Sequence, residues 1–172
     1  MHTESLDGQL SAIIFFYMTT THRIFLFLLR VSLGWYMFFA GFEKVLNPDW
    51  TAKGFLLGAK TFPDFYAWFA LPANTWWVDP LNAWGILLVG VALVLGIAVR
   101  PAASAGATLM ALYYFPHNAF PIVPHGYIVE EHVIYGIAML TLAFLPPKEH
   151  YGLGNGIRKT RLGKMPILRS LL

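Results

Sequence analysis

Residues 23–44 read RIFLFLLRVSLGWYMFFAGFEK, and this apolar stretch decides the fold. About 20 apolar residues in a helix are enough to cross the hydrocarbon core of a bilayer, so we predict a membrane-spanning helix here. Five of its residues follow at steps of three and four and therefore share one helical stripe: Arg30, Gly34, Met37, Gly41 and Lys44. Because two glycines lie between the charged ends, this stripe is predicted to pack closely against other helices.

The composition of the chain agrees with a membrane protein. Its 172 residues are 57% hydrophobic and only 12% charged, against roughly 25% charged residues in ordinary soluble domains. The chain has no cysteine, which excludes disulfides, thiolate metal sites and cysteine nucleophiles. Residues 1–21 lack the basic region and cleavage site of a signal peptide and are predicted to be an interfacial lead-in.

Three further apolar segments predict an all-α, integral membrane four-helix bundle that forms a single domain over residues 1–172. The spans are expected at about residues 23–46, 80–99, 101–116 and 127–146. Asp79 and Pro80 are typical of an N-cap followed by proline at the first helical position. Arg100 and Pro101 predict a tight turn between the second and third spans.

An aromatic-rich segment, residues 49–78, lies between the first two predicted spans. Pro63 divides it into two short pieces. Tryptophan and tyrosine favour the headgroup level of a bilayer, so we expect two short amphipathic helices in the interface. They either cover the end of the bundle or form a lid over a binding pocket.

The basic residues predict the orientation. One side of the membrane would carry Arg23, Arg30, Arg100 and six basic residues of the tail, 147–172, and the other Lys44, Lys53 and Lys60. By the positive-inside rule both termini are then cytoplasmic, in a multi-pass protein of the plasma membrane. The basic tail is expected to face anionic lipid rather than nucleic acid.

Titratable residues from distant segments are predicted to meet at the outer rim of the bundle. The candidate catalytic residues are Glu43, Lys44, His117, Glu131 and His132, with His125 and Glu130 close by. Such groups suit a pocket for a small anion or a quinone head, where acid and base groups handle protons. Alternatively, these charges lie in water and hold the loops in place. Glu131 is preferred to Glu130 because it shares a helical face with Tyr135.

Four residues are candidates for contact with the quinone: Arg30, Trp50, Tyr113 and Tyr135. Arg30 has an alternative role, because its side chain can reach the cytoplasmic headgroups or pair within the bundle. We predict no metal site, since the His and Glu spacing matches no zinc motif. A haem ligated by two of the histidines is equally unexpected, and the chain has no nucleotide-binding loop.

Several short motifs resemble the DoxX-like membrane proteins. The first motif is the pattern Arg30, Gly34, Gly41 and Lys44. The second is residues 84–103, which include the arginine–proline turn at 100–101. The third is residues 151–154, Tyr-Gly-Leu-Gly. The tryptophan-rich segment between the first two spans is similar to the DoxD branch, one subunit of thiosulfate:quinone oxidoreductase.

This resemblance implies a membrane redox subunit that links oxidation of a small sulfur anion such as thiosulfate to quinone reduction at the outer face. It also implies a partner subunit, DoxA in the DoxD enzyme, in addition to the lipid bilayer. The alternative from another class is a non-catalytic accessory or packing subunit of a larger membrane redox complex, or a homo-oligomer. A transporter or channel ranks third, because four short spans with few buried charges offer no evident path.

Overall fold

The computed structural model describes residues 2–124, 126–145 and 152–154, with side chains from residue 20 onward. This part of the chain is mostly helical, with one small hairpin. Its elements, in order, are α1 (His2–Leu46), α2 (Lys53–Leu57), α3 (Pro63–Phe69), α4 (Pro72–Leu95), α5 (Val99–His117), β1 (Ile122–Val123), β2 (Gly126–Tyr127) and α6 (Glu131–Phe144). The predicted basic tail, apart from residues 152–154, and His125 lie outside the described residues.

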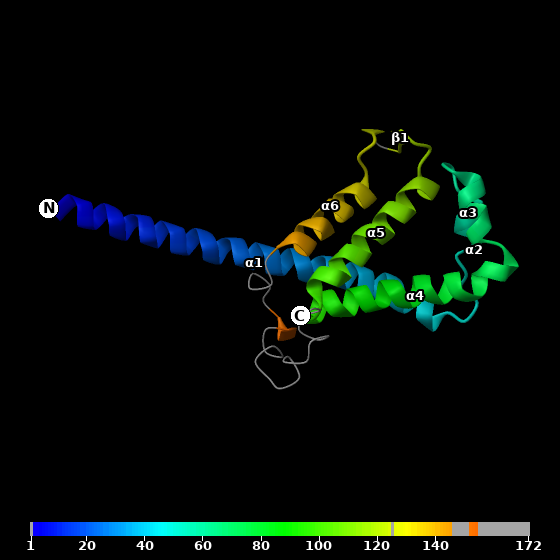
Figure 1. Ribbon diagram of the computed structural model, residues 1–172, viewed down its shortest axis with the longest axis horizontal. Coiled ribbons are helices and arrows are strands. Elements are labelled where there is room, and N and C mark those ends of the chain that lie inside the picture. Colours follow the sequence, from blue (N-terminus) through cyan, green and yellow to red (C-terminus); the bar gives the residue numbers. More distant parts are fainter. Residues whose placement is uncertain (1, 125, 146–151, 155–172) are drawn as a thin grey trace.

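Four long helices alternate in direction and pack in pairs. α1 lies along α4, α5 lies along α6, and further contacts join α4 to α5 and α1 to α6 (Figure 1). The end of α1, the start of α4, the end of α5 and the start of α6 therefore lie at one end of the bundle, beside α2, α3 and the hairpin. We call this the lid end.

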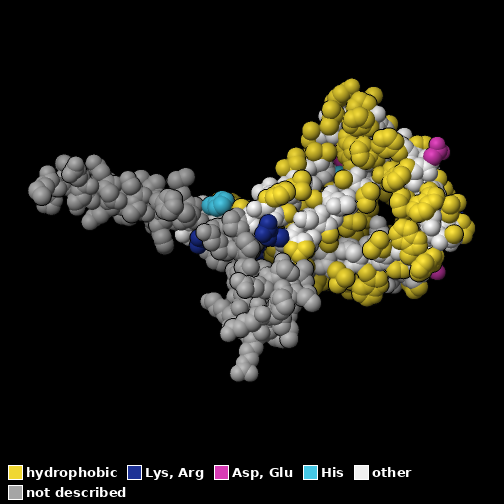
Figure 2. Space-filling model, viewed as in Figure 1, with side chains coloured by type: hydrophobic (Ala, Val, Ile, Leu, Met, Phe, Trp, Pro, Cys, Tyr) yellow, Lys and Arg dark blue, Asp and Glu magenta, His cyan; other side chains and the backbone are white. Residues whose placement is uncertain are grey.

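Two of the described helices are long and apolar enough to cross a membrane, Thr20–Leu46 within α1 and Pro72–Leu95. α6 is apolar but has only 14 residues. Two of the four predicted spans are therefore candidate spans by length and composition, and the four-span bundle stays a prediction. On the face shown in Figure 2, hydrophobic side chains cover most of the described surface.

Two helix starts differ from the predictions. α4 begins at Pro72 rather than Pro80, and Pro80 lies inside the helix. The Asp79 carboxylate does not cap α4; its Oδ1 accepts a hydrogen bond from the Ala52 backbone nitrogen at 3.0 Å and so ties the α2 segment to α4. α1 begins at His2, so the predicted interfacial lead-in continues the first helix instead.

The third span ends one residue from its predicted bound of 116, and Pro116 lies buried in the last turn of α5. The connection that follows forms a short antiparallel hairpin that pairs Ile122 with Tyr127.

Glycines form the contact between α1 and α4, as the stripe in the sequence predicts. A Cβ atom on Gly41 would overlap the backbone nitrogen of Leu87, and one on Gly90 would overlap the backbone nitrogen of Phe38. A Cβ on Gly34 would lie 2.8 Å from a backbone nitrogen of α4. The two backbones are therefore in direct contact along this seam, which holds the two helices at a fixed separation.

Candidate functional site

A cavity of about 270 Å³ lies at the lid end between the four long helices and the α2 segment. We call it the polar cavity. Its lining residues are Lys44, Trp50, Thr51, Ala52, Phe55, Asn82, Tyr113 and His132. Four of these were predicted site or contact residues, and segments far apart in the sequence supply them.

Lys44 brings a positive charge into the polar cavity from the last turn of α1. Its Nζ donates a hydrogen bond to Asn82 Oδ1 at 3.2 Å. The same ammonium lies 5.0 Å from the ring centroid of Trp50 and 5.4 Å from that of Tyr113. Aromatic faces attract a cation but give it no proton acceptor, so this ammonium keeps donors for an oxygen in the cavity.

Asn82 connects three helices at the polar cavity. Besides accepting from Lys44, its Nδ2 donates to the Tyr113 hydroxyl at 2.7 Å. Because that hydroxyl accepts from Asn82, its own hydrogen remains a donor for a ligand. Asn82 was not among the predicted site residues. The signal was the one amide in the predicted apolar span 80–99, where polar groups are costly and usually functional.

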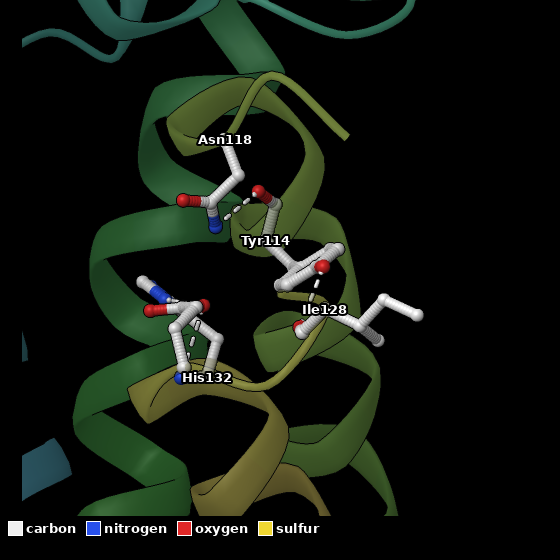
Figure 3. Close-up of polar contacts among 5 residues, drawn as sticks. Tyr114, Asn118, Ile128 and His132 are labelled. Atoms are coloured by element: carbon white, nitrogen blue, oxygen red, sulfur yellow. Dashed lines mark hydrogen bonds and ion pairs between the residues drawn. The ribbon is translucent and has the colours of Figure 1, made fainter. Parts of the chain in front are cut away.

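His132, labelled in Figure 3, forms a pair with Glu130 at the start of α6. Glu130 is the N-cap: its side chain accepts from the His132 backbone nitrogen at 3.2 Å, and its Oε1 lies 2.7 Å from His132 Nδ1. The side chains are only 16% exposed for His132 and 12% for Glu130. The carboxylate therefore fixes the orientation of the imidazole, whose Nε2 is the nitrogen that can serve a ligand.

The prediction that Glu131 points inward is wrong. Glu131 is exposed, whereas Glu130 is half-buried. The reason is local, because the helix begins at Glu131 and the capping position before it turns its side chain back over the first turn. The carboxylate beside the cavity is therefore that of Glu130.

The loop between α5 and α6 is held in place by hydrogen bonds next to this pair (Figure 3). The Tyr114 hydroxyl donates to the Ile128 carbonyl at 2.7 Å, and Asn118 Nδ2 donates to the Tyr114 carbonyl at 3.1 Å. Ile128 adopts a left-handed conformation with φ of 64°. These contacts bring the start of α6, and with it His132, back against α5.

The other predicted site residues are divided between the rim and the bundle. His117 is exposed, but its ring centroid lies 5.7 Å from that of His132, which places it at the rim of the cavity. Glu43 is exposed and does not line the cavity. Tyr135 packs on Tyr36, with ring centroids 5.0 Å apart, and on the hydrophobic core, so it does not line the cavity either.

Arg30, the remaining candidate for contact with the quinone, does not lie at this site. Arg30 precedes Lys44 by 14 residues on one helix, which places it about 21 Å away along the axis. Its side chain is buried, only 1% exposed, and lies against Gly96 and Gly152 at the other end of the bundle. The guanidinium also lies 5.3 Å from the ring centroid of Phe27. The Arg30 side chain therefore packs within the bundle and does not reach the headgroups.

Three side chains at the start of α6 could offer ligand atoms to a metal ion. Those of Glu130, Glu131 and His132 lie within 4.8 Å of one another. The contact between Glu130 and His132 is however a direct hydrogen bond, which occupies one oxygen and one nitrogen of this set. The arrangement suits proton transfer better than metal binding.

The α2–α3 segment forms a lid over the cavity rather than a mere cover of the bundle end. Ala52 and Phe55 line the polar cavity directly. The Tyr66 hydroxyl of α3 donates to the Leu112 carbonyl of α5 at 3.0 Å, and Thr61 Oγ1 donates to the Asn118 carbonyl at 2.6 Å. Burial raises the pKa of the Tyr66 phenol, so the neutral hydroxyl is the form that closes the lid.

Comparison with known proteins identifies a family. A family model described as DoxX matches residues 25–118, which is more than half of the chain. No curated protein and no solved structure matches. The matched region includes Lys44, Asn82 and Tyr113, whereas Glu130 and His132 follow it.

Proposed function

Because the chain belongs to the DoxX family and has two apolar helices of spanning length, we propose that it is the quinone-binding subunit of a membrane redox system. The family and the helices show a membrane protein. The polar cavity at the lid end supports the finer assignment.

A quinone head is a flat ring with two carbonyl oxygens, so its site needs hydrogen-bond donors and apolar walls. The polar cavity offers three donors, the Lys44 ammonium, the Tyr113 hydroxyl and the His132 imidazole, from α1, α5 and α6. Trp50 and Phe55 provide aromatic walls. The convergence of these donors in one cavity is the observation that carries the proposal.

The side chains also match what reduction requires. Reduction of a quinone takes up two electrons and two protons, and negative charge develops on the ring oxygens. Lys44 stabilises that charge in a partly desolvated site. His132 supplies one proton through Nε2 and the second is taken up from water; Glu130, which holds Nδ1 at 2.7 Å, orients the ring and stabilises its protonated form.

We assign the source of the electrons to a small sulfur anion such as thiosulfate. Two thiosulfate ions that each lose one electron join through a new sulfur–sulfur bond, and the two electrons reduce one quinone. The described residues at the lid end carry six carboxylates against three lysines: Glu43, Asp49, Asp64, Asp79, Glu130 and Glu131 against Lys44, Lys53 and Lys60. This excess of negative charge repels an anion but not a neutral quinone. We therefore place oxidation of the anion on a partner subunit.

We also propose that α5 and α6 cross the membrane beside α1 and α4, with both termini cytoplasmic. The four helices alternate in direction (Figure 1), which supports an even number of crossings. On the face shown in Figure 2, Lys and Arg side chains lie toward the end from which α1 projects, and acidic side chains lie at the far end. With the six basic residues that follow α6 in the sequence, the positive-inside rule supports a lid end on the outer side.

Binding of a tailless quinone tests the proposal. The protein, with any partner that co-purifies, is placed in lipid nanodiscs and titrated with 2,3-dimethoxy-5-methyl-1,4-benzoquinone. Lys44→Met is expected to weaken binding about tenfold or more, because a hydrogen bond from a charged donor is lost. The matched control is Lys53→Met, since Lys53 is exposed and does not line the cavity. Equal affinities for the two variants, or no binding to the wild type, would contradict the proposal.

A non-catalytic packing subunit is the second candidate, and one observation favours it. A Cβ atom on Gly85 of α4 would meet nothing within 4 Å, and the neighbouring Trp84 is 52% exposed. A glycine on an open helix face lets a second helix approach closely. If Gly85→Leu releases a co-purifying subunit while quinone binding is absent from the wild type, this candidate replaces the first.

A further inference from the structure

A second cavity, of about 130 Å³, lies beside the polar cavity under the two lid helices. We call it the lid cavity. Its walls come from α2, α3, α4 and α5 and are almost entirely apolar; Leu56, Phe69, Val78 and Leu109 are among them. Among its polar side chains, Asn82 and Tyr113 hydrogen bond to each other. This cavity therefore suits a hydrocarbon group and not an ion.

The two cavities adjoin each other along one side. Ala52, Phe55, Asn82 and Tyr113 line both of them. The rings of Phe55 and Tyr113 meet edge to face with centroids 5.9 Å apart. A molecule whose polar head occupies the polar cavity would therefore pass its next atoms directly into the lid cavity.

We propose that the lid cavity binds the first isoprene unit of the quinone tail, so that the site selects tailed quinones. This inference rests on the proposed function. The size agrees, because a cavity of about 150 Å³ in another protein holds one benzene molecule. A five-carbon isoprene unit is of similar bulk, so one unit fits and the rest of the tail must leave.

An exit for the remaining tail lies between α4 and α5. Leu81 and Leu112 line the lid cavity, yet they are 64% and 42% exposed, so they mark its mouth on the apolar surface. The hydrogen bond from Tyr66 to the Leu112 carbonyl holds α3 against this mouth. The tail would leave past these two leucines into lipid, which is the solvent it prefers.

Two probes with one head and different tails test the inference in nanodiscs. The first is the tailless benzoquinone above, and the second carries two isoprene units on the same head. Val78→Phe places an aromatic ring in the lid cavity, and this ring fills the volume that an isoprene unit would need. We expect the affinity of the tailed probe to fall at least about fivefold, with no change for the tailless probe. The control is Val91→Phe, because Val91 is also half-buried on α4 and lines neither cavity.

A second pair of variants decides the matter if Val78→Phe does not fold. Leu81→Trp narrows the mouth, and Leu88→Trp is its control on the same helix, with starting exposures of 64% and 60%. If the cavity-lining variants weaken both probes equally or neither, the inference is overturned while the proposed function stands. If the wild type binds neither probe, both are overturned. A weaker affinity for the tailed probe alone supports both the inference and the proposed function.

Discussion

The seam between α1 and α4 and the lid end are built in opposite ways. Along the seam, Gly41 and Gly90 leave no room for a Cβ atom, and backbones touch. At the lid end the same two helices present Lys44 and Asn82, and aromatic side chains from α2 and α5 surround two cavities. The seam therefore sets the separation of the helices, and this separation positions the Asn82 amide against the Lys44 ammonium.

The largest expected effect comes from breaking the seam. Gly90→Ala adds a Cβ against the backbone of Phe38, so the two helices must move apart. Overpacking of this kind costs roughly 1–3 kcal/mol, which corresponds to a fall in Tm of about 2–12 °C for a chain of this size. Thermal unfolding in nanodiscs measures it.

Gly85→Ala is the matched control on the same helix, because its Cβ position is open. An alanine there has the better helix propensity, so its Tm should stay the same or rise. If both alanine variants show the same Tm, the close seam does not determine stability.

A smaller effect is expected on catalysis at the lid end. Glu130→Gln keeps an oxygen that can cap α6 but removes the charge that supports a protonated His132. We expect the rate of quinone reduction by thiosulfate in the intact complex to fall about tenfold, with binding of the tailless quinone unchanged. Glu131→Gln, one residue on and exposed, should leave the rate unchanged, and a loss in both variants would point to α6 stability instead.

Removal of one donor from the polar cavity should have a milder effect on binding. Tyr113→Phe keeps the ring beside Lys44 but removes the hydroxyl that accepts from Asn82. The loss of one neutral hydrogen bond, about 1 kcal/mol, predicts roughly fivefold weaker binding of the tailless quinone. Tyr127→Phe is the control, since Tyr127 is 66% exposed and distant from the cavity lining. Unchanged affinity of Tyr113→Phe would remove this residue from the site.

The smallest effect concerns the lid itself. Burial raises the pKa of Tyr66 above its usual value of 10.0, so the folded lid favours the neutral phenol. The contribution of the Tyr66 hydroxyl to the stability of the lid is fully present below pH 10. It is lost as the pH rises through the higher pKa of the folded state. The protection factor of residues 63–69, which compares the observed exchange with the base-catalysed intrinsic rate, should therefore fall at alkaline pH in the wild type. Tyr66→Phe should show about 1 kcal/mol less protection at neutral pH and lose that alkaline dependence; an identical pH profile would refute the role of the hydroxyl.

The seam could be predicted from the sequence because it depends on spacing within one helix. Gly34 and Gly41 recur on a single stripe, and a stripe of small residues in an apolar helix has few uses besides packing. The position of Lys44 at the end of that stripe followed from the same periodicity. These features are local, so no knowledge of the partner helix was needed.

The site could be predicted only in part, because it depends on where helices begin and which helices meet. Glu131 was preferred to Glu130 by helical periodicity, but Glu130 precedes the helix and acts as its cap. Asn82 was missed because its two partners lie 38 and 31 residues away in the sequence. The start of α4 was misplaced because Asp79 resembles a cap, although its carboxylate binds the lid segment.

The most direct test of the central claim is to cross-link a photoreactive azidoquinone to the protein in nanodiscs and map the labelled peptides by mass spectrometry. If a quinone binds in the polar cavity, labels are expected at the lid end, in residues 50–55 and around Tyr113 and His132. These labels should disappear when unmodified quinone competes. Labels at the opposite end, around Arg30 and Gly96, or labels that the competitor does not reduce, would contradict the claim.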